Sequence, residues 1–236
     1  MRKAGSSIGE GITSSFSAGA NAVSDFFDGK MTLGGNYLFG RSDADVIKSN
    51  YTTTYLQDKS GRDYNRITDE DNVSHEIDYN HKFGLRLEHK FSKKATLIFE
   101  PSISYRDNRF TESGMETISK DNLDGRALEG ISEASTFGEG RGKTINTGGF
   151  LLFNRKLGLP GRTLSVTSRY SVSHYNLTGV SRSNTYHFDS GIEDPVDQRY
   201  DYITKSDNFN FRVNYIEPMG HNIYISGYIA CHWDAS

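Results

Sequence analysis

The chain has 236 residues, of which 35% are hydrophobic and 24% are charged, and its formal net charge is −3. With glycine counted and tyrosine left out, the apolar share is about 39%, whereas a soluble globule has roughly 45–50% on that count. Phe and Tyr are nevertheless abundant, at 14 each, which argues against a disordered coil. The composition therefore predicts an ordered protein without a large soluble core. With a pI near 6.2 and no basic stripe, we expect no nucleic acid partner.

Three further classes are excluded by simple sequence features. The longest purely apolar run, residues 150–153, is far shorter than the ~18 residues that a membrane-spanning helix needs. The N-terminus has a basic pair but no apolar segment after it, so it is not a secretory signal. Cys231 is the single cysteine, which excludes a disulfide framework and a Cys-rich zinc site.

Alternation of apolar and polar residues predicts eight β-strands. It is most regular over residues 73–91, where odd positions are apolar or aromatic and even positions are polar or charged. A period of two over this length is typical of a long strand with one apolar and one charged face, whereas strands of soluble domains average about 5–6 residues. Pro101 lies inside the fourth strand and predicts a β-bulge or a strand boundary there. In chain order, the predicted strands cover residues 12–23, 31–39, 73–91, 95–106, 145–157, 164–173, 209–215 and 223–233.

The connections between these strands are of two kinds. Short turns fall at residues 27–29, 92–94, 159–161 and 219–221, and between them lie long polar excursions at about 40–72, 107–144 and 177–207. Short turns on one side and long extracellular loops on the other are the layout of an antiparallel outer-membrane β-barrel. Within the excursions, residues 51–55 and 185–188 resemble strands that continue past the membrane edge. A closed barrel is expected because hydrocarbon leaves no partner for an unpaired sheet edge.

Four stretches resemble a known family: residues 34–46 (GGNYLFGRSDADV), 85–108 (LRLEHKFSKKATLIFEPSISYRDN), 148–174 (GGFLLFNRKLGLPGRTLSVTSRYSVSH) and 209–228 (FNFRVNYIEPMGHNIYISGY). They resemble the β-barrel region of TonB-dependent receptor-like outer-membrane proteins of the Bacteroidetes type. The resemblance covers residues 12–233. It implies uptake of a nutrient or metal chelate across the outer membrane of a Gram-negative bacterium, by a 22-stranded barrel with a plug domain inside it.

We therefore expect residues 12–236 to be a partial barrel domain of about eight strands, preceded by a flexible start at residues 1–11, with the plug domain and signal peptide absent from the chain. The turns recur about every 60–67 residues, so eleven strand pairs would take roughly 700 residues. The resulting 22 strands are an even number within the range known for such barrels. Eight strands could also close alone. The expected partners are outer-membrane lipid, the missing plug and the remaining strands. For the full-length protein, the resemblance implies two further possible partners, a surface lipoprotein or the periplasmic energy-transducing protein.

The sequence offers no catalytic residues, no cofactor and no resident metal, and we expect no enzyme activity. Residues 138–144 contain Gly-Lys-Thr, but a phosphate-binding loop would need glycine where Phe137 stands, so a flexible loop stem is expected. His75, His81 and His89 share one strand face, but the first two are already ~20 Å apart at strand rise and cannot share a metal. Acidic clusters could bind calcium through oxygen ligands, although solvated loop charge is favoured. These clusters are Asp43/Asp45, Asp69/Glu70/Asp71 and Asp121/Asp124.

The long excursions also carry tyrosines that could form a rim for ligand capture, because aromatic rings with polar neighbours suit sugar, peptide or chelate recognition. Packing between protruding hairpins is the alternative reading for each of them. The inward charged row of the third strand could line water or hydrogen-bond a plug; it comprises Glu76, Asp78, Lys82, Arg86, Glu88 and Lys90. The candidate ligand contacts are Tyr51, Tyr55, Tyr64, Tyr186, Tyr200 and Tyr202.

Two other functional classes stay open at this point. One is a non-transporting outer-membrane barrel that acts as a surface scaffold or adhesin, in which loops bind a partner and nothing passes. The other is a soluble all-β binding protein, which would be monomeric in water without detergent. An upstream plug domain in the full reading frame favours transport, and its absence excludes transport.

Overall fold

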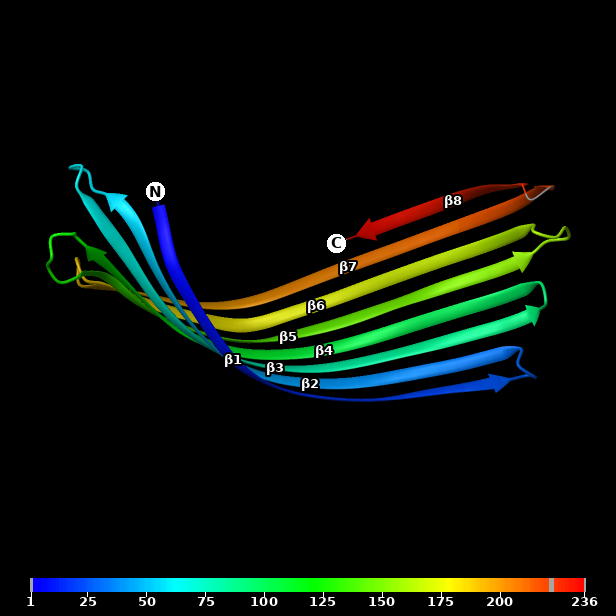
Figure 1. The fold of residues 1–236 in the computed structure, drawn as a ribbon. Helices are drawn as coiled ribbons and strands as arrows, with labels where there is room; N and C mark the ends of the chain where they lie inside the picture. Colours follow the sequence, from blue (N-terminus) through cyan, green and yellow to red (C-terminus); the bar gives the residue numbers. More distant parts are fainter. Residues whose placement is uncertain (1, 221–222, 236) are drawn as a thin grey trace.

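The computed structural model describes residues 2–220 and 223–235, and these residues are all-β (Figure 1). Outside this part lie Met1 of the expected flexible start, His221 of the fourth predicted turn, and Ser236 at the end of the chain. No helix in the described part is long and apolar enough to cross a membrane. The strands are β1 (Arg2–Phe26), β2 (Met31–Gln57), β3 (Asp63–Ser92), β4 (Ala95–Asp121), β5 (Glu129–Lys156), β6 (Thr163–His187), β7 (Ile192–Gly220) and β8 (Ile223–Ala235).

All eight strands belong to one antiparallel sheet, in the order β1 to β8, and each pairs with its neighbour in the sequence. The sheet is a single curved layer whose edges, β1 and β8, do not pair with each other over the described residues (Figure 1). The predicted eight-stranded antiparallel fold is therefore confirmed, whereas closure into a barrel stays a prediction. β1 begins at Arg2, within the segment expected to be flexible.

The polar excursions are strands rather than long loops, which corrects the expected layout. β2 and β3 stay paired without a register shift from Met31↔His89 to Gln57↔Asp63, and only residues 58–62 connect them. Residues 51–55 and 185–187 are strand, as expected, whereas Phe188 lies in a hairpin tip. Thr- and Tyr-rich sequence suits strands, and each added residue extends a ladder whose register is already set. Figure 1 shows these hairpin tips at the end of the sheet opposite the short turns.

Pro101 sits inside β4 without the predicted bulge or strand boundary. The β3–β4 register is the same on both sides of it, at Gly84↔Ser102 and Leu87↔Phe99, and only the pairings opposite Leu85 and Arg86 are missing. Proline lacks an amide hydrogen and so removes hydrogen bonds, but it adds no residue to the strand. The ladder therefore resumes in register.

The register places most of the apolar residues of the eight strands on one face of the sheet; Leu38, Ile98, Phe150 and Leu152 are exceptions on the other face. Neighbouring partners can be followed across it, as in Phe39↔His81, His81↔Tyr105, Tyr105↔Ile145 and Ile145↔His174. Side chains alternate between faces, so the apolar parity of each strand shares this face. We call the resulting surface the apolar band. It comprises even positions of 16–26 and 164–174, and odd positions of 31–39, 81–91, 95–105, 145–153, 209–215 and 223–233.

A single-layer sheet has nothing to cover this band. Among the described residues Ile118 is the only buried hydrophobic side chain, and it lies outside the band. Within the band, Phe83 is 43% exposed and Ile229 is 79% exposed. A domain normally buries an apolar face against a second layer, and a large uncovered patch marks a membrane or partner surface. The fold thus leaves a wide apolar face that requires another medium.

Candidate functional site

The opposite face of the sheet carries cross-strand ion pairs. Arg106 of β4 donates two hydrogen bonds to Asp78 of β3, with Nε–Oδ1 2.6 Å and Nη2–Oδ2 2.8 Å. These bonds hold the pKa of Asp78 below its ordinary value, against the opposing effect of partial burial. Nearer the short turns, Arg86 pairs with Glu100 and, at 3.5 Å, with Glu88. Among the described residues, all members of the charged row that the sequence assigned to this face form ion pairs except Lys82.

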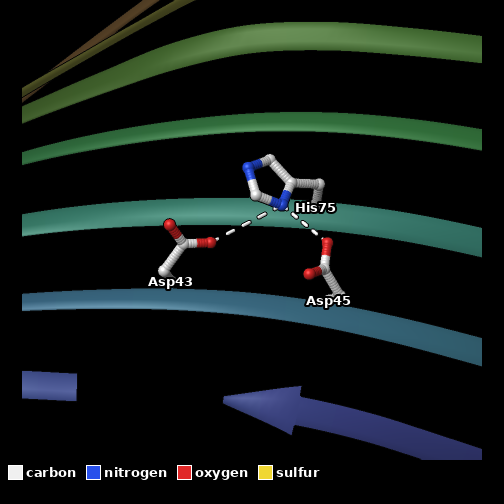
Figure 2. Close-up of side chains that lie close together, drawn as sticks. All are labelled: Asp43, Asp45 and His75. Atoms are coloured by element: carbon white, nitrogen blue, oxygen red, sulfur yellow. Dashed lines mark hydrogen bonds and ion pairs between the residues drawn. The ribbon is translucent and has the colours of Figure 1, made fainter. Parts of the chain in front are cut away.

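Beyond the apolar band, on the same face as the band, the structure brings together two carboxylates and an imidazole (Figure 2). Asp43 and Asp45 lie two residues apart on β2, and Asp45 is the register partner of His75 on β3. The Nδ1 atom of His75 is 2.7 Å from Oδ1 of Asp45 and 3.7 Å from Oδ1 of Asp43. All three donor atoms lie within 4.8 Å of one another. This is a compact set of oxygen and nitrogen ligands.

The cluster is fixed by paired strands and is open to solvent. The side chains of Asp43, His75 and Asp45 are 30%, 44% and 66% exposed. Arg41 holds the other oxygen of Asp43, with Nη2–Oδ2 3.1 Å, and leaves Oδ1 directed at the imidazole. The guanidinium of Arg41 also lies 5.6 Å from the ring centre of Tyr79. Arg41 therefore orients the carboxylate of Asp43, and Tyr79 in turn packs against the guanidinium of Arg41.

Asp43 and Asp45 are evident as a pair in the sequence, but their link to His75 is not. The expectation for the aspartates was solvated loop charge, and His75 was expected to share a face only with histidines of its own strand. The missing information was the β2–β3 register across the polar excursion. Continuing the alternation of residues 31–39 through the excursion would have placed Asp43 and Asp45 on the face of His75.

The other two acidic clusters are used locally. Asp69 and Asp71 share one face of β3, and Glu70 lies on the other, where Asn72 and Asn50 donate to it. Hydrogen bonds from these asparagines lower the pKa of Glu70.

At the β4–β5 tip, Asp121 and Asp124 each accept a hydrogen bond from a backbone amide two residues later, Leu123 and Arg126, at 2.9 and 3.1 Å. These two carboxylates therefore stabilise the turn that connects β4 with β5.

The six candidate tyrosines are divided between the two faces of the sheet. Tyr51, Tyr55 and Tyr186 lie on the face of the apolar band, and Tyr64, Tyr200 and Tyr202 lie on the opposite face. Several pack locally: Tyr186 meets Phe188 edge to face at 5.1 Å between ring centres, Tyr202 meets Tyr175 at 6.3 Å, and Lys120 Nζ lies 5.0 Å from the ring centre of Tyr64. Ligand contact through these residues stays a prediction.

The other sequence motifs are part of the sheet. The Gly-Lys-Thr stretch at 138–144 lies within β5 and is neither a loop stem nor the start of a helix. His81 sits between Phe39 and Tyr105 and shares a hydrogen bond with Tyr37, Nδ1–Oη 2.7 Å. His89 packs edge to face on Phe91. These two histidines therefore belong to aromatic clusters near the two limits of the apolar band.

Comparison with known proteins gives only weak structural neighbours. No protein-family model matches the chain, and no curated protein matches it. Among solved structures, a siderophore receptor of Acinetobacter baumannii is 8% identical with a TM-score of 0.17, over 91% of this chain and 49% of the receptor. The ferric yersiniabactin uptake receptor of Yersinia pestis is 10% identical with a TM-score of 0.21, over 97% and 50%. This chain thus spans about half the length of these receptors, and such scores carry no argument about function.

Proposed function

We propose that the chain is part of an outer-membrane β-barrel of a receptor-like uptake protein, and that it takes part in no catalytic step. The observation that carries the proposal is the apolar band, which runs across all eight strands on one face while mostly polar and charged residues occupy the other. A bilayer covers such a band, and a water-filled interior accommodates the charged face. Lipid therefore takes the place of the second layer that the sheet lacks.

The height of the band fits a bilayer. In the long strands it spans about eleven residues, for example 81–91, which is roughly 36 Å of strand at 3.3 Å per residue. At the ~45° tilt of membrane barrels this becomes about 25 Å, the typical height of the lipid-facing belt. The aromatic residues near its limits, such as Phe91 and Tyr105, suit the interfacial girdles of these barrels.

Uptake of a nutrient or a metal chelate is the finer part of the proposal. It is supported by the sequence resemblance to TonB-dependent receptor-like proteins and by a charged face that suits a wet interior. In this arrangement the short turns lie in the periplasm, and the extended hairpins stand outside the cell. A scaffold or adhesin is the second candidate, favoured by the length of these hairpins and by exposed rings such as Tyr51 and Tyr202 at their surface.

Cysteine accessibility tests the assignment of the two faces. Cys231→Ser removes the single cysteine of this chain, and any cysteine elsewhere in the full-length protein is replaced as well; single cysteines are then placed at Phe83, Leu85 and Ser102. In outer-membrane vesicles permeable to small solutes, a charged maleimide should label the Ser102→Cys variant and leave Phe83→Cys and Leu85→Cys unlabelled until detergent is added. Equal labelling at the three positions would refute a lipid-facing band.

Transport and scaffolding are separated by the remainder of the protein. A plug domain in the same reading frame and loss of cargo uptake on its deletion would support a transporter. A full reading frame without a plug, with cell-surface binding retained, would support the scaffold. Recovery of the full-length protein as a monomer in water, without detergent, would overturn both.

A further inference from the structure

We propose that Asp43, Asp45 and His75 bind a divalent transition-metal ion such as Zn²⁺ on the extracellular part of the β2–β3 hairpin. The three side chains supply two carboxylate oxygens and one imidazole nitrogen, a mixed set that suits Zn²⁺ and its neighbours in the first transition row. Ca²⁺ prefers an all-oxygen set, so an imidazole ligand disfavours it.

The spacing of the donor atoms fits one ion. Zinc bonds to oxygen and nitrogen are about 2.0–2.1 Å long, so the edges of a zinc tetrahedron are roughly 3.3 Å. His75 Nδ1 lies 2.7 Å from Asp45 Oδ1 and 3.7 Å from Asp43 Oδ1, values on either side of this edge. Figure 2 shows both carboxylates directed at the same nitrogen from one side. The two carboxylate oxygens lie within 4.8 Å of each other, so rotation of the side chains would have to draw the three donors in around a central ion.

Hydrogen bonding alone does not use this arrangement fully. A single Nδ1–H donates well to one carboxylate, and at 3.7 Å Asp43 Oδ1 is too far to accept from the same ring atom. Elsewhere on this face, Asp107 is matched by Arg141, with Nε–Oδ1 2.7 Å, and a second cation, Arg109, lies within 3.9 Å. The cluster instead sets two carboxylates against one imidazole, with Arg41 engaged on the far oxygen of Asp43. A divalent cation satisfies the three donors together.

The surroundings of the site also resemble those of a protein metal centre. Arg41 orients Asp43 through Oδ2, as outer-shell groups orient ligating carboxylates. All three ligands stand on paired strands, which hold donors more rigidly than loops do. The half-exposed side chains leave the remaining coordination position to water. In the proposed barrel the site lies outside the lumen, so the ion would fasten β2 to β3 at the cell surface and would not be cargo. This placement rests on the proposed function, but metal binding itself does not.

Calorimetric titration with Zn²⁺ tests the site in the full-length protein, purified in detergent and stripped with EDTA. The wild type should bind one more Zn²⁺ than His75→Ala, and Asp45→Asn should weaken that site at least tenfold. His174→Ala and Asp71→Asn are matched controls and should leave it unchanged. Co²⁺ added to the wild type should give the strong visible absorption of a tetrahedral complex, which His75→Ala should lose.

Equal Zn²⁺ stoichiometry and affinity in wild type and His75→Ala would overturn the proposal, as would Ca²⁺ that competes on equal terms with Zn²⁺. Heat-modifiable gel mobility reports whether each variant is folded. If His75→Ala does not fold, the folded Asp45→Asn variant is used instead. Loss of the Co²⁺ spectrum in that variant supports the site, and retention of the spectrum refutes it. Zn²⁺ binding in a protein whose band is labelled from water would keep the metal site and refute the membrane assignment. No Zn²⁺ binding in a protein whose band is protected from the maleimide would refute only the metal site.

Discussion

Arg106 on β4 donates two hydrogen bonds to the carboxylate of Asp78 on β3, although the two residues are 28 positions apart in the chain. The Asp78 side chain is only 12% exposed, whereas that of Arg106 is 49% exposed. Removal of the guanidinium would therefore leave a poorly hydrated carboxylate with only Asn108 as a close donor, at 3.1 Å. Asp78 depends on its partner more than an ordinary surface residue would.

From this geometry we expect Arg106→Gln to destabilise the β3–β4 pair by roughly 1 kcal/mol, at the upper end of the range for exposed pairs because one partner is largely buried. Arg66→Gln is the matched control, since Arg66 is an exposed β3 residue that forms no ion pair within the described chain. Chemical unfolding of the protein in detergent micelles measures both changes. Equal losses in the two variants would show that the bidentate contact adds nothing.

The face assignment makes a sharper prediction at mid-height of the apolar band. Leu85→Arg places a charge on the lipid side and should cost about 2–4 kcal/mol near the midplane. Ser102→Arg adds the same residue on the opposite face, where Ser102 is exposed and is the register partner of Gly84, and should cost little. Reversible unfolding in lipid vesicles gives both values, and similar penalties would contradict the two-faced sheet. Arg86 is a poorer control, because its removal also leaves Glu100 without its cation.

Strand parity and the short turns could be predicted from the sequence because both are local. The alternation at 31–39 and 73–91 directly reports which side chains share a face, and a turn at residues 27–29 leaves little freedom of register. The turn itself uses left-handed backbone at Phe27, Asp28 and Gly29, with φ of 55°, 53° and 76°. Such turns match the twist of a β-hairpin.

The candidate metal cluster depends on a non-local property. Asp45 and His75 are 30 positions apart in the chain and meet only if β2 and β3 stay in register through the polar excursion. Nothing in that sequence has a buried face that would fix register, so a loop and a ladder are both compatible with its composition. For the same reason the six tyrosines could be assigned to a common rim, whereas the ladder places three on each face.

Acid should loosen the β2–β3 hairpin tip before it affects the strands. Asp58 accepts hydrogen bonds from the backbone amides of Ser60 and Arg62, at 2.8 and 2.9 Å, and from the Ser60 hydroxyl at 2.6 Å. The Ser60 hydroxyl, and then the Arg62 amide, lowers the pKa of Asp58 from 3.8 to about 2. A lowered carboxyl pKa adds stability that is complete above the unfolded value and is lost as pH falls through the folded one.

Hydrogen exchange, corrected for intrinsic rates, should therefore show protected Ser60 and Arg62 amides at pH 5 and loss of their protection as pH falls from about 4 to 2. Asp58→Ala should lose this protection already at pH 5. Lys59→Ala, an exposed change at the same tip, should retain the wild-type profile. Protection that is independent of pH in the wild type would rule out the carboxylate as the group that orders the tip.

The close approach of β5 and β6 at Gly179 gives a steric prediction. A Cβ atom added there would lie 2.5 Å from the backbone oxygen of Glu139 and would also meet the ring of Tyr200. A backbone atom cannot swing aside as a flexible side chain can, so Gly179→Ala should force the strands apart at a cost of about 1–3 kcal/mol. Gly40→Ala is the control, because its nearest neighbour would be the Asn80 side chain at 3.9 Å. Exchange of the β6 amides should accelerate markedly in Gly179→Ala, and β2 should exchange normally in Gly40→Ala. Unchanged exchange in both variants would mean that β5 and β6 lie farther apart at Gly179 than in this structure.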